Sequence, residues 1–449
     1  MKNFKLITTL QILIFFSSCN FLLEETPVDT LQENELSSEH IQSLVRGVYH
    51  TLADCTPAGL ILNDCLGEII ENNSNNGSLV NANIAHNNFS SDNSFVENYY
   101  YHFYSVIHQA NYALNYLSTK SDLSNISNRQ MIGSLHYLRA YCYLKLVTQF
   151  GDVPISTQIT EEVIPRSPAS DVWQLIKDDL DIAITQCRSW DQAPPEFPTA
   201  ARYYYYASSE AASALLARVY LYNKEYNKAK SIARRFLEDS RFQLIPAANM
   251  AASAVGVGPK ELIMCISNNT GAYYYRNIFN TYAMTPSGSY QFKPSQSFID
   301  SMDPTDARYT LCIGQSNDGY TTVNKFNYNS VSTCPFTISR FTEMYLIFAE
   351  CAPDESGLEK LNYLRSERNL PPLDKKILND PSKYIDAILD ERKFEFYGEN
   401  HYFYDLVRLG KALDKLVYTK NKYQFLLPIP QSQVNLGLKQ NPGSVSYTH

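Results

Sequence analysis

The chain has 449 residues, of which 44% are hydrophobic and 19% charged, so it contains enough apolar side chain to bury a sizeable core. Lysine and arginine number 38 and acidic residues 46, which gives a net charge of −8. The absence of a basic patch argues against nucleic-acid binding. Tyrosine is frequent, with 34 residues against 2 tryptophans, and most of these rings are expected to pack between helices.

The first residues have the pattern of an export signal. Two lysines precede an apolar run, residues 6–16, which is too short to span a bilayer. The run ends in Ser-Ser-Cys at Cys19 and resembles a bacterial lipobox, with Phe16 where leucine is usual. We therefore expect residues 1–18 to be a lipoprotein signal peptide, Cys19 to be lipidated, and residues 19–34 to form a tether. An ordinary secretory signal is the alternative.

The nine cysteines show no CxxC pair and no zinc-ligand spacing. We therefore expect no metal site and no cofactor. Cys55 and Cys65 lie close together in sequence, in a stretch expected to be a loop. An oxidising compartment would permit a disulfide between them, and two separate thiols are the alternative.

Hydrophobic periodicity predicts a mostly α-helical fold built from helix pairs. The third pair is the clearest, because the Tyr226-x-x-Ala229 spacing and the length of the pair match one tetratricopeptide repeat. The predicted pairs are residues 41–52 with 95–117, 128–150 with 170–187, 207–222 with 226–239, and 341–351 with 356–368.

Two long segments interrupt this helical pattern. Residues 54–93 are rich in asparagine, serine and glycine, which favour loops and turns. Residues 242–340 lack periodicity apart from a candidate buried strand at 261–266. Irregular segments of this length inside an ordered domain often carry the binding function.

Near the end, residues 388–412 combine a helical apolar pattern with charged residues. Charges next to a buried face are costly unless they are paired. We therefore expect a buried ionic network in which Arg392 and Arg408 bridge the acidic residues, with Arg408 paired with Glu391 or Glu395. The predicted structural network comprises Glu391, Arg392, Glu395, Asp405 and Arg408, and no reaction is suggested by it.

Several motifs follow one another in an order that resembles the SusD/RagB family, the surface lipoproteins of Bacteroidetes nutrient-uptake systems. They include LRAY followed by GDVP, YLIFAE, LNYLR, ERKFEFYGE, YDLVRLGK, and LPIPQSQV followed by QNPG. The resemblance implies tetratricopeptide-like helical repeats in residues 35–240 and an irregular, loop-rich C-terminal part in residues 241–449, within the same compact unit.

The resemblance also implies a function. Family members are lipid-anchored at the exposed face of the cell outer membrane and deliver a captured nutrient to a TonB-dependent outer-membrane transporter of the SusC type. The implied ligand is an oligosaccharide, and peptide capture of the RagB type is the alternative.

A sugar site needs aromatic ring faces beside amide and carboxylate groups. In the family, loops from the two irregular regions hold the ligand. Their composition selects the candidate ligand-binding residues Asn72, Asn73, Asn75, Asn76, Tyr99, Tyr100, Tyr273, Tyr274, Tyr275 and Tyr290. For each tyrosine, packing in the fold is the competing interpretation.

Catalysis is not expected. The chain contains no nucleophile elbow, no HExxH motif and no P-loop. Acidic pairs such as Asp178 and Asp179 lack a supporting histidine or cleft pattern. A hydrolase and a purely structural repeat protein are the rival classes, distinguished by turnover of a glycan and by partner binding without any ligand.

Overall fold

The computed structural model describes residues 38–55, 57–73, 79–120, 125–160, 162–192, 203–250, 260–266, 278–281, 284, 288–325 and 336–443. The expected signal peptide and tether therefore lie outside the described residues. The chain divides into two units, residues 1–43 and residues 44–449. The first unit contributes only the opening residues of the first described helix.

The described part of the chain is dominated by helices. The long ones are α2 (Ser38–Ala53), α6 (Ser94–Lys120), α7 (Ile126–Phe150), α8 (Ala169–Gln186), α9 (Ser209–Tyr222), α10 (Tyr226–Leu237), α15 (Phe341–Cys351), α16 (Glu355–Ser366) and α17 (Pro381–Glu395). Shorter ones are α3 (Pro57–Leu60), α4 (Leu62–Leu66), α5 (Leu79–Ala85), α11 (Ala247–Met250), α13 (Gln296–Ser301), α14 (Tyr309–Cys312), α18 (Tyr402–Arg408), α19 (Ala412–Lys415) and α20 (Gln431–Asn435).

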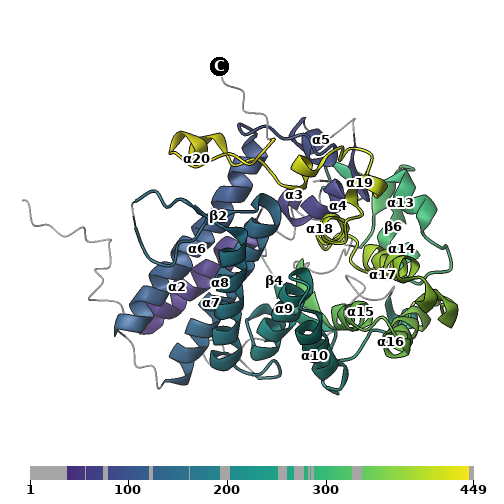
Figure 1. Cartoon of the computed structure of the whole chain (residues 1–449), viewed down its shortest axis with the longest axis horizontal. Helices are drawn as coiled ribbons and strands as arrows, with labels where there is room; N and C mark the ends of the chain where they lie inside the picture. Colours follow the sequence, from purple (N-terminus) through teal and green to yellow (C-terminus); the bar gives the residue numbers. More distant parts are fainter. Residues whose placement is uncertain are drawn as a thin grey trace, which may run out of the picture. The chain divides into compact units, whose positions relative to one another are not determined.

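The long helices pack in chain order. Helix α6 contacts α7, α7 contacts α8, α8 contacts α9 and α9 contacts α10 (Figure 1). Helix α10 then contacts α15, which contacts α16, although about a hundred residues separate α10 from α15 in sequence. This sequential stacking of helix pairs confirms the predicted mostly α, tetratricopeptide-like fold, and the helix bounds agree with the predicted pairs to within three residues.

Short two-stranded sheets lie in the segments that connect the long helices. They pair β1 (Ile70–Asn72) with β5 (Phe292–Pro294), β2 (Val153–Pro154) with β3 (Arg166–Ser167), β4 (Leu262–Ile266) with β8 (Phe336–Arg340), and β6 (Ile313–Gln315) with β7 (Thr321–Val323). Strand β4 confirms the predicted buried strand, since four of its five residues are buried. All four pairs are antiparallel.

A buried carboxylate, Glu395 at the end of α17, ties three distant segments together. Its Oε1 accepts hydrogen bonds from Arg340 Nη1 at 2.7 Å and from Arg368 Nη2 at 2.9 Å. Its Oε2 accepts from Arg368 Nε at 2.9 Å and from Arg308 Nη1 at 3.0 Å. All three guanidinium groups are at most 1% exposed, so this cluster holds α17 against β8, the end of α16 and the start of α14.

Arg408 is buried, as expected, but the predicted pairing with Glu391 or Glu395 is wrong. Arg408 Nε donates to Asp405 Oδ1 at 2.7 Å, and Arg408 Nη2 donates to Glu350 Oε2 at 2.8 Å. Asp405 Oδ2 also accepts from Arg392 Nε at 2.7 Å. The five predicted charges therefore belong to two separate buried clusters, one centred on Asp405 and one centred on Glu395.

The C-terminal segment returns to the ends of α6 and α7. The backbone N–H of Leu427 donates to Gln149 O at 2.7 Å, and Asn441 Nδ2 donates to Phe150 O at 3.0 Å. Gln431 N donates to Ser91 O at 2.7 Å, which brings α20 beside the start of α6 (Figure 1). Cys65 is a buried free thiol, so no disulfide joins it to Cys55.

Candidate functional site

The two irregular segments meet at the β1–β5 pair. Asn72 lies opposite Phe292, and Glu71 lies opposite Lys293, with an ion pair of 3.0 Å between Glu71 and Lys293. Ladder bonds continue beyond the strands, because the backbone N–H of Asn73 donates to Gln291 O at 2.9 Å. Strand β1 belongs to the asparagine-rich segment and β5 to the second irregular segment, so the two segments are direct neighbours at this strand pair.

Asn73 and Tyr290 fix the geometry of this junction. Asn73 is buried, and its Nδ2 donates to Tyr290 O at 2.9 Å. Tyr290 is also buried and has φ of 42°, a conformation uncommon for a residue with a side chain. Its hydroxyl donates to Thr321 O at 2.6 Å, and its ring lies 5.3 Å from the half-exposed ring of Tyr320. Asn73 and Tyr290 therefore stabilise the junction from the protein interior.

A cavity of about 370 Å³ opens beside the β1–β5 pair. Acidic, basic, amide, hydroxyl and aromatic side chains all contribute to its wall. The lining residues are Glu68, Ile70, Glu71, Asn72, Ala85, His86, Lys293, Ser295, Gln296, Ser297, Val417 and Tyr418. They come from β1, the end of α5, β5, α13 and the segment after α19.

The aromatic part of this wall is a pair of rings, His86 and Tyr418. Their centroids are 4.3 Å apart, and the Tyr418 side chain is 43% exposed. The Tyr418 segment is held by Glu68, whose carboxylate accepts hydrogen bonds from the backbone N–H groups of Val417 at 2.8 Å and of Tyr418 at 2.6 Å. The ring is thus anchored through its backbone while its face stays accessible.

The polar part of the wall includes an acceptor without a partner. The Oδ1 atom of Asn72 is buried and forms no hydrogen bond with any residue that the structure describes. A polar atom left unpaired away from water carries a penalty. An accessible tyrosine ring beside an amide side chain and the Glu71–Lys293 pair is the combination expected where a ligand with apolar faces and hydroxyl groups binds.

The structure corrects the assignment of Tyr99 and Tyr100. Both lie on α6 and are at most 4% exposed, and the Tyr100 ring packs edge-on against Phe150 at 5.1 Å. Tyr99 packs against Phe103 at 4.8 Å. Tyr99 and Tyr100 are core residues, so packing in the fold, the alternative to ligand binding, holds for these two rings. The other predicted residues Asn75, Asn76, Tyr273, Tyr274 and Tyr275 lie outside the described residues.

Sequence reasoning missed most of the cavity wall. Tyr418 and Glu68 are about 350 residues apart in sequence, and no local pattern connects them. His86 belongs to the asparagine-rich segment, and its local sequence does not mark it as part of a binding site. Within the described ranges, no cluster of three or more His, Cys, Asp or Glu side chains is arranged to hold a metal ion.

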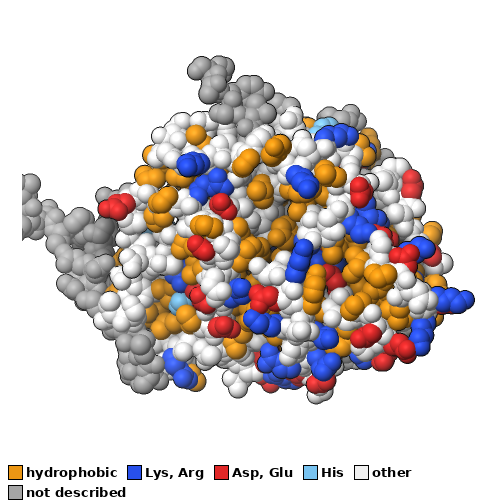
Figure 2. All heavy atoms as spheres, in the orientation of Figure 1, with side chains coloured by type: hydrophobic (Ala, Val, Ile, Leu, Met, Phe, Trp, Pro, Cys, Tyr) orange, Lys and Arg blue, Asp and Glu red, His pale blue; other side chains and the backbone are white. Residues whose placement is uncertain are grey.

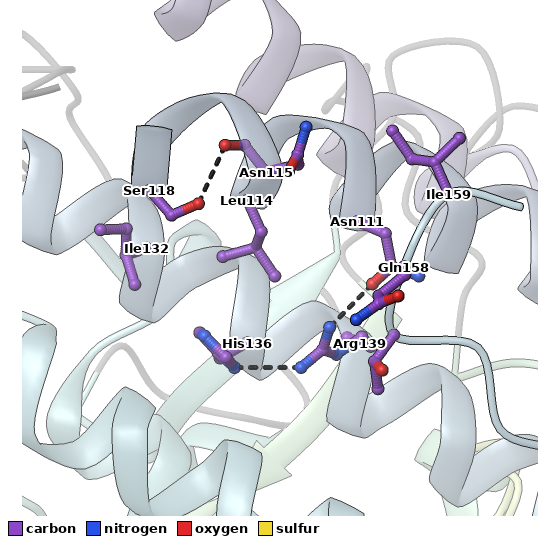
Figure 3. Close-up of a pocket in the computed structure, with 10 residues that line it drawn as sticks. Asn111, Leu114, Asn115, Ser118, Ile132, His136, Arg139, Gln158 and Ile159 are labelled. Carbon is purple, nitrogen blue, oxygen red and sulfur yellow. Dashed lines mark hydrogen bonds between the residues drawn. The ribbon is translucent and has the colours of Figure 1, made fainter. Parts of the chain in front are cut away.

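A larger cavity, about 600 Å³, lies between α6, α7 and residues 157–159 (Figure 3). It is lined by amide, hydroxyl and aliphatic side chains together with His136 and Arg139, and its lining contains no tyrosine, phenylalanine or tryptophan ring. Arg139 is occupied within the fold, since its Nη1 donates to Asn111 Oδ1 and its Nε to Asp179 Oδ2.

The Asp179 carboxylate behind this second cavity stays ionised. Burial acts to raise the pKa of Asp179, but hydrogen bonds from Arg139 and His136 outweigh burial and hold it below its usual range. The charge of Arg139 is thereby balanced inside the protein. Among the described residues that line it, the second cavity thus offers no tyrosine, phenylalanine or tryptophan ring face, in contrast to the β1–β5 cavity.

The visible surface mixes charges of both signs. Acidic and basic side chains alternate over the face in Figure 2, with hydrophobic atoms exposed between them. This distribution of charge, like the composition, gives no support to nucleic-acid binding. None of the helices in the described part of the chain combines the length and apolar character needed to cross a bilayer.

Comparison with known proteins gives the family context. A family model described as "Starch-binding associating with outer membrane" matches residues 20–221, and a model described as "SusD family" matches residues 266–443. SusD-like protein P2 of Formosa agariphila is 23% identical over an alignment that covers 99% of this chain and 100% of that protein. SusD-like protein P38 of the same species is 24% identical, with coverage of 70% and 72%.

Solved structures show the same fold. A SusD superfamily protein from Bacteroides vulgatus has a TM-score of 0.75 at 22% identity, covering 91% of this chain and 99% of its own. A protein described as a laminarin-binding SusD-like protein has a TM-score of 0.74 at 20% identity, with the same coverage. The family models, the curated relatives and the fold agree, and the chain belongs to the SusD/RagB family.

Proposed function

We propose that this protein binds an oligosaccharide in the β1–β5 cavity at the cell surface. The observation that carries the proposal is the combination of the accessible Tyr418 ring with the Asn72 side chain and the Glu71–Lys293 pair in one cavity. A sugar ring can place its apolar face on the tyrosine while its hydroxyls pair with the amide group of Asn72. The nearby charges of Glu71 and Lys293 offer further hydrogen bonds at the rim.

The comparisons support the class of ligand. One neighbour in structure is described as laminarin-binding, and another, from Bacteroides fluxus, as a surface glycan-binding protein. One of the matched family models carries a description as starch-binding. Glucans of these kinds are accordingly the first ligands to try.

The experiment is calorimetry of the purified protein with oligosaccharides derived from laminarin and starch, extended to other glycans, and with extended peptides in parallel. Saturable binding of a glycan with one site per chain, without turnover, is the expected result. Saturable binding of peptides alone would replace the proposal with the RagB-type alternative. Release of shorter sugars during the titration would indicate a hydrolase.

We further propose that the protein is anchored in the outer membrane through Cys19 and passes its ligand to a TonB-dependent transporter of the SusC type. The support is the lipobox-like sequence and the membership of a family whose matched model is described as associating with the outer membrane. Co-purification of a SusC-type transporter with this protein from its native outer membrane tests the partnership, and its absence under mild detergent would contradict the proposal.

Replacement of Cys19 by alanine should release the protein from the membrane. The thioether-linked lipid supplies the hydrophobic anchor, and the amino-acid sequence after residue 18 offers no comparable apolar run at this end. The measurement is fractionation of cells that express the variant, with Ser18→Ala as the matched control that keeps the cysteine. Equal membrane fractions for Cys19→Ala and wild type would contradict lipidation.

A further inference from the structure

A third cavity, also polar, lies inside the protein, between α7, α9, β8 and the segment before α18. Its free volume is about 20 Å³, and it shares no lining residue with the β1–β5 cavity. A space of this size holds one or two particles as large as a water molecule. It lies where the helical repeats meet the C-terminal part, because its wall combines Lys145 and Arg218 with Thr337 and His401.

Several polar groups of the residues that line this cavity have no hydrogen-bond partner among the described residues. The hydroxyl groups of Tyr141, Tyr222 and Tyr404 form no hydrogen bond with any residue that the structure describes. The Nδ1 atom of His401 is buried and likewise has no partner among the described residues. Buried polar atoms are normally satisfied by protein, water or ions, so this group of side chains points to an occupant.

The cavity wall also carries one positive charge that is not neutralised. Arg218 is paired with Glu343, whose carboxylate oxygens lie 2.6 Å from Arg218 Nε and Nη2. Glu399 is paired with Lys325 and with Arg340. Lys145, in contrast, forms no ion pair with a carboxylate of the described residues.

The surroundings of Lys145 disfavour its charged form. Its Nζ lies 5.3 Å from the centroid of the Tyr141 ring. Burial, followed by the positive charge of Arg218, lowers the pKa of Lys145 to about 8. An occupant with a negative charge would offset both causes, whereas a water molecule would offset only the loss of hydration and not the repulsion from Arg218.

We propose that this cavity binds a single monoatomic anion, chloride under physiological conditions, held by the Lys145 ammonium and the surrounding tyrosine hydroxyls. The size of the cavity excludes phosphate and sulfate, whose four oxygens need more space. The anion would connect α7 and α9 to the C-terminal segment through shared donors. This inference is independent of the glycan proposal, since the two sites have no residue in common.

The direct test is crystallography of the protein grown or soaked in sodium bromide, with data collected at the bromine absorption edge. An anomalous peak in the cavity, within hydrogen-bond distance of Lys145 Nζ, is the expected result. A cavity that contains only water at saturating bromide, with no anomalous signal, would overturn the proposal. This measurement uses the unaltered protein and does not depend on how a variant folds.

A second test measures the melting temperature in sodium chloride and in sodium gluconate at equal ionic strength. Each tenfold rise in chloride above the dissociation constant should raise the melting temperature by about 2 °C in a chain of this size. Lys145→Met should abolish the difference between the two salts.

The matched control is Lys393→Met, because Lys393 also lies over an aromatic ring, that of Phe394 at 4.4 Å, but is paired with Asp390. This variant should keep the chloride response. An equal response to chloride in wild type and in Lys145→Met would show that the effect arises elsewhere, and the proposal would fall.

Discussion

Replacement of Glu395 by glutamine should destabilise the protein more than any other single charge removal in the C-terminal part. The carboxylate accepts four hydrogen bonds from Arg308, Arg340 and Arg368, and all of these groups are buried. A neutral amide leaves three buried guanidinium groups with less negative charge and places N–H donors toward other donors. Removing one partner of a buried pair typically costs about 3–5 kcal/mol.

For a chain of this length, that loss corresponds to a fall in melting temperature of about 3–5 °C. Thermal unfolding followed by circular dichroism is the measurement. Glu359→Gln is the matched control, because Glu359 is 72% exposed and its one ion pair among the described residues is with the half-buried Lys360. The control should melt close to wild type, since exposed ion pairs contribute little. If both variants melt alike, Glu395 is not the centre of a stabilising cluster.

The same carboxylate should make stability fall on acidification. Burial acts to raise the pKa of Glu395, but the charges of Arg368, Arg340 and Arg308 outweigh burial and hold it well below the ordinary value of 4.5. A carboxylate with a depressed folded-state pKa contributes stability above its unfolded pKa and loses it as the pH falls through the folded value. The advantage of wild type over Glu395→Gln should therefore shrink below about pH 4.5.

Replacement of Tyr418 by alanine should weaken glycan binding by about thirtyfold, with little change in stability. Loss of an aromatic residue at the centre of a binding site often costs at least about 2 kcal/mol. The Tyr418 side chain is 43% exposed, and the hydrogen bonds that hold its segment involve backbone atoms, which the substitution keeps. Isothermal titration with the oligosaccharide found by screening is the measurement.

Tyr101→Ala is the matched control for this experiment. Tyr101 is 71% exposed on α6 and is not among the residues that line the cavity. It should bind the glycan as wild type does. Normal binding by Tyr418→Ala, or equal losses in both variants, would show that the ring does not stack on the ligand.

The helical scaffold could be predicted because periodicity is a local property. The third pair illustrates this: apolar residues recur with the helical period on α9 and α10, and the turn between them allows Lys224 to adopt a positive φ. Strand β4 could also be predicted from the sequence, because it is a short, continuous run of apolar residues. Neither assignment required knowledge of a distant partner.

The three consecutive tyrosines at the start of α6 show how a local pattern can mislead. Taken as a cluster, they suggested an aromatic platform. On a helix, successive residues point about 100° apart, so Tyr99 joins Phe95 and Phe103 on the buried face while Tyr101 points to solvent. Attention to the i, i+4 spacing of these rings would have assigned Tyr99 to the core.

Ionic partners and the site wall could not be predicted, because their members are distant in sequence. The burial of Arg408 followed from its apolar neighbours, but its partner Glu350 lies 58 residues earlier and on another helix. Likewise, the cavity joins Asn72 to Tyr418 through the folding of the C-terminal segment onto β1. One sequence does not indicate which of many acids or rings closes such a contact.

The most direct test of the proposed glycan site is a crystal structure of the protein with its oligosaccharide bound. Sugar density is expected in the β1–β5 cavity, with one ring face against Tyr418 and a hydroxyl within hydrogen-bond distance of the Asn72 amide group. Density in the cavity between α6 and α7, or anywhere that leaves Tyr418 and Asn72 without contact, would contradict the proposed site.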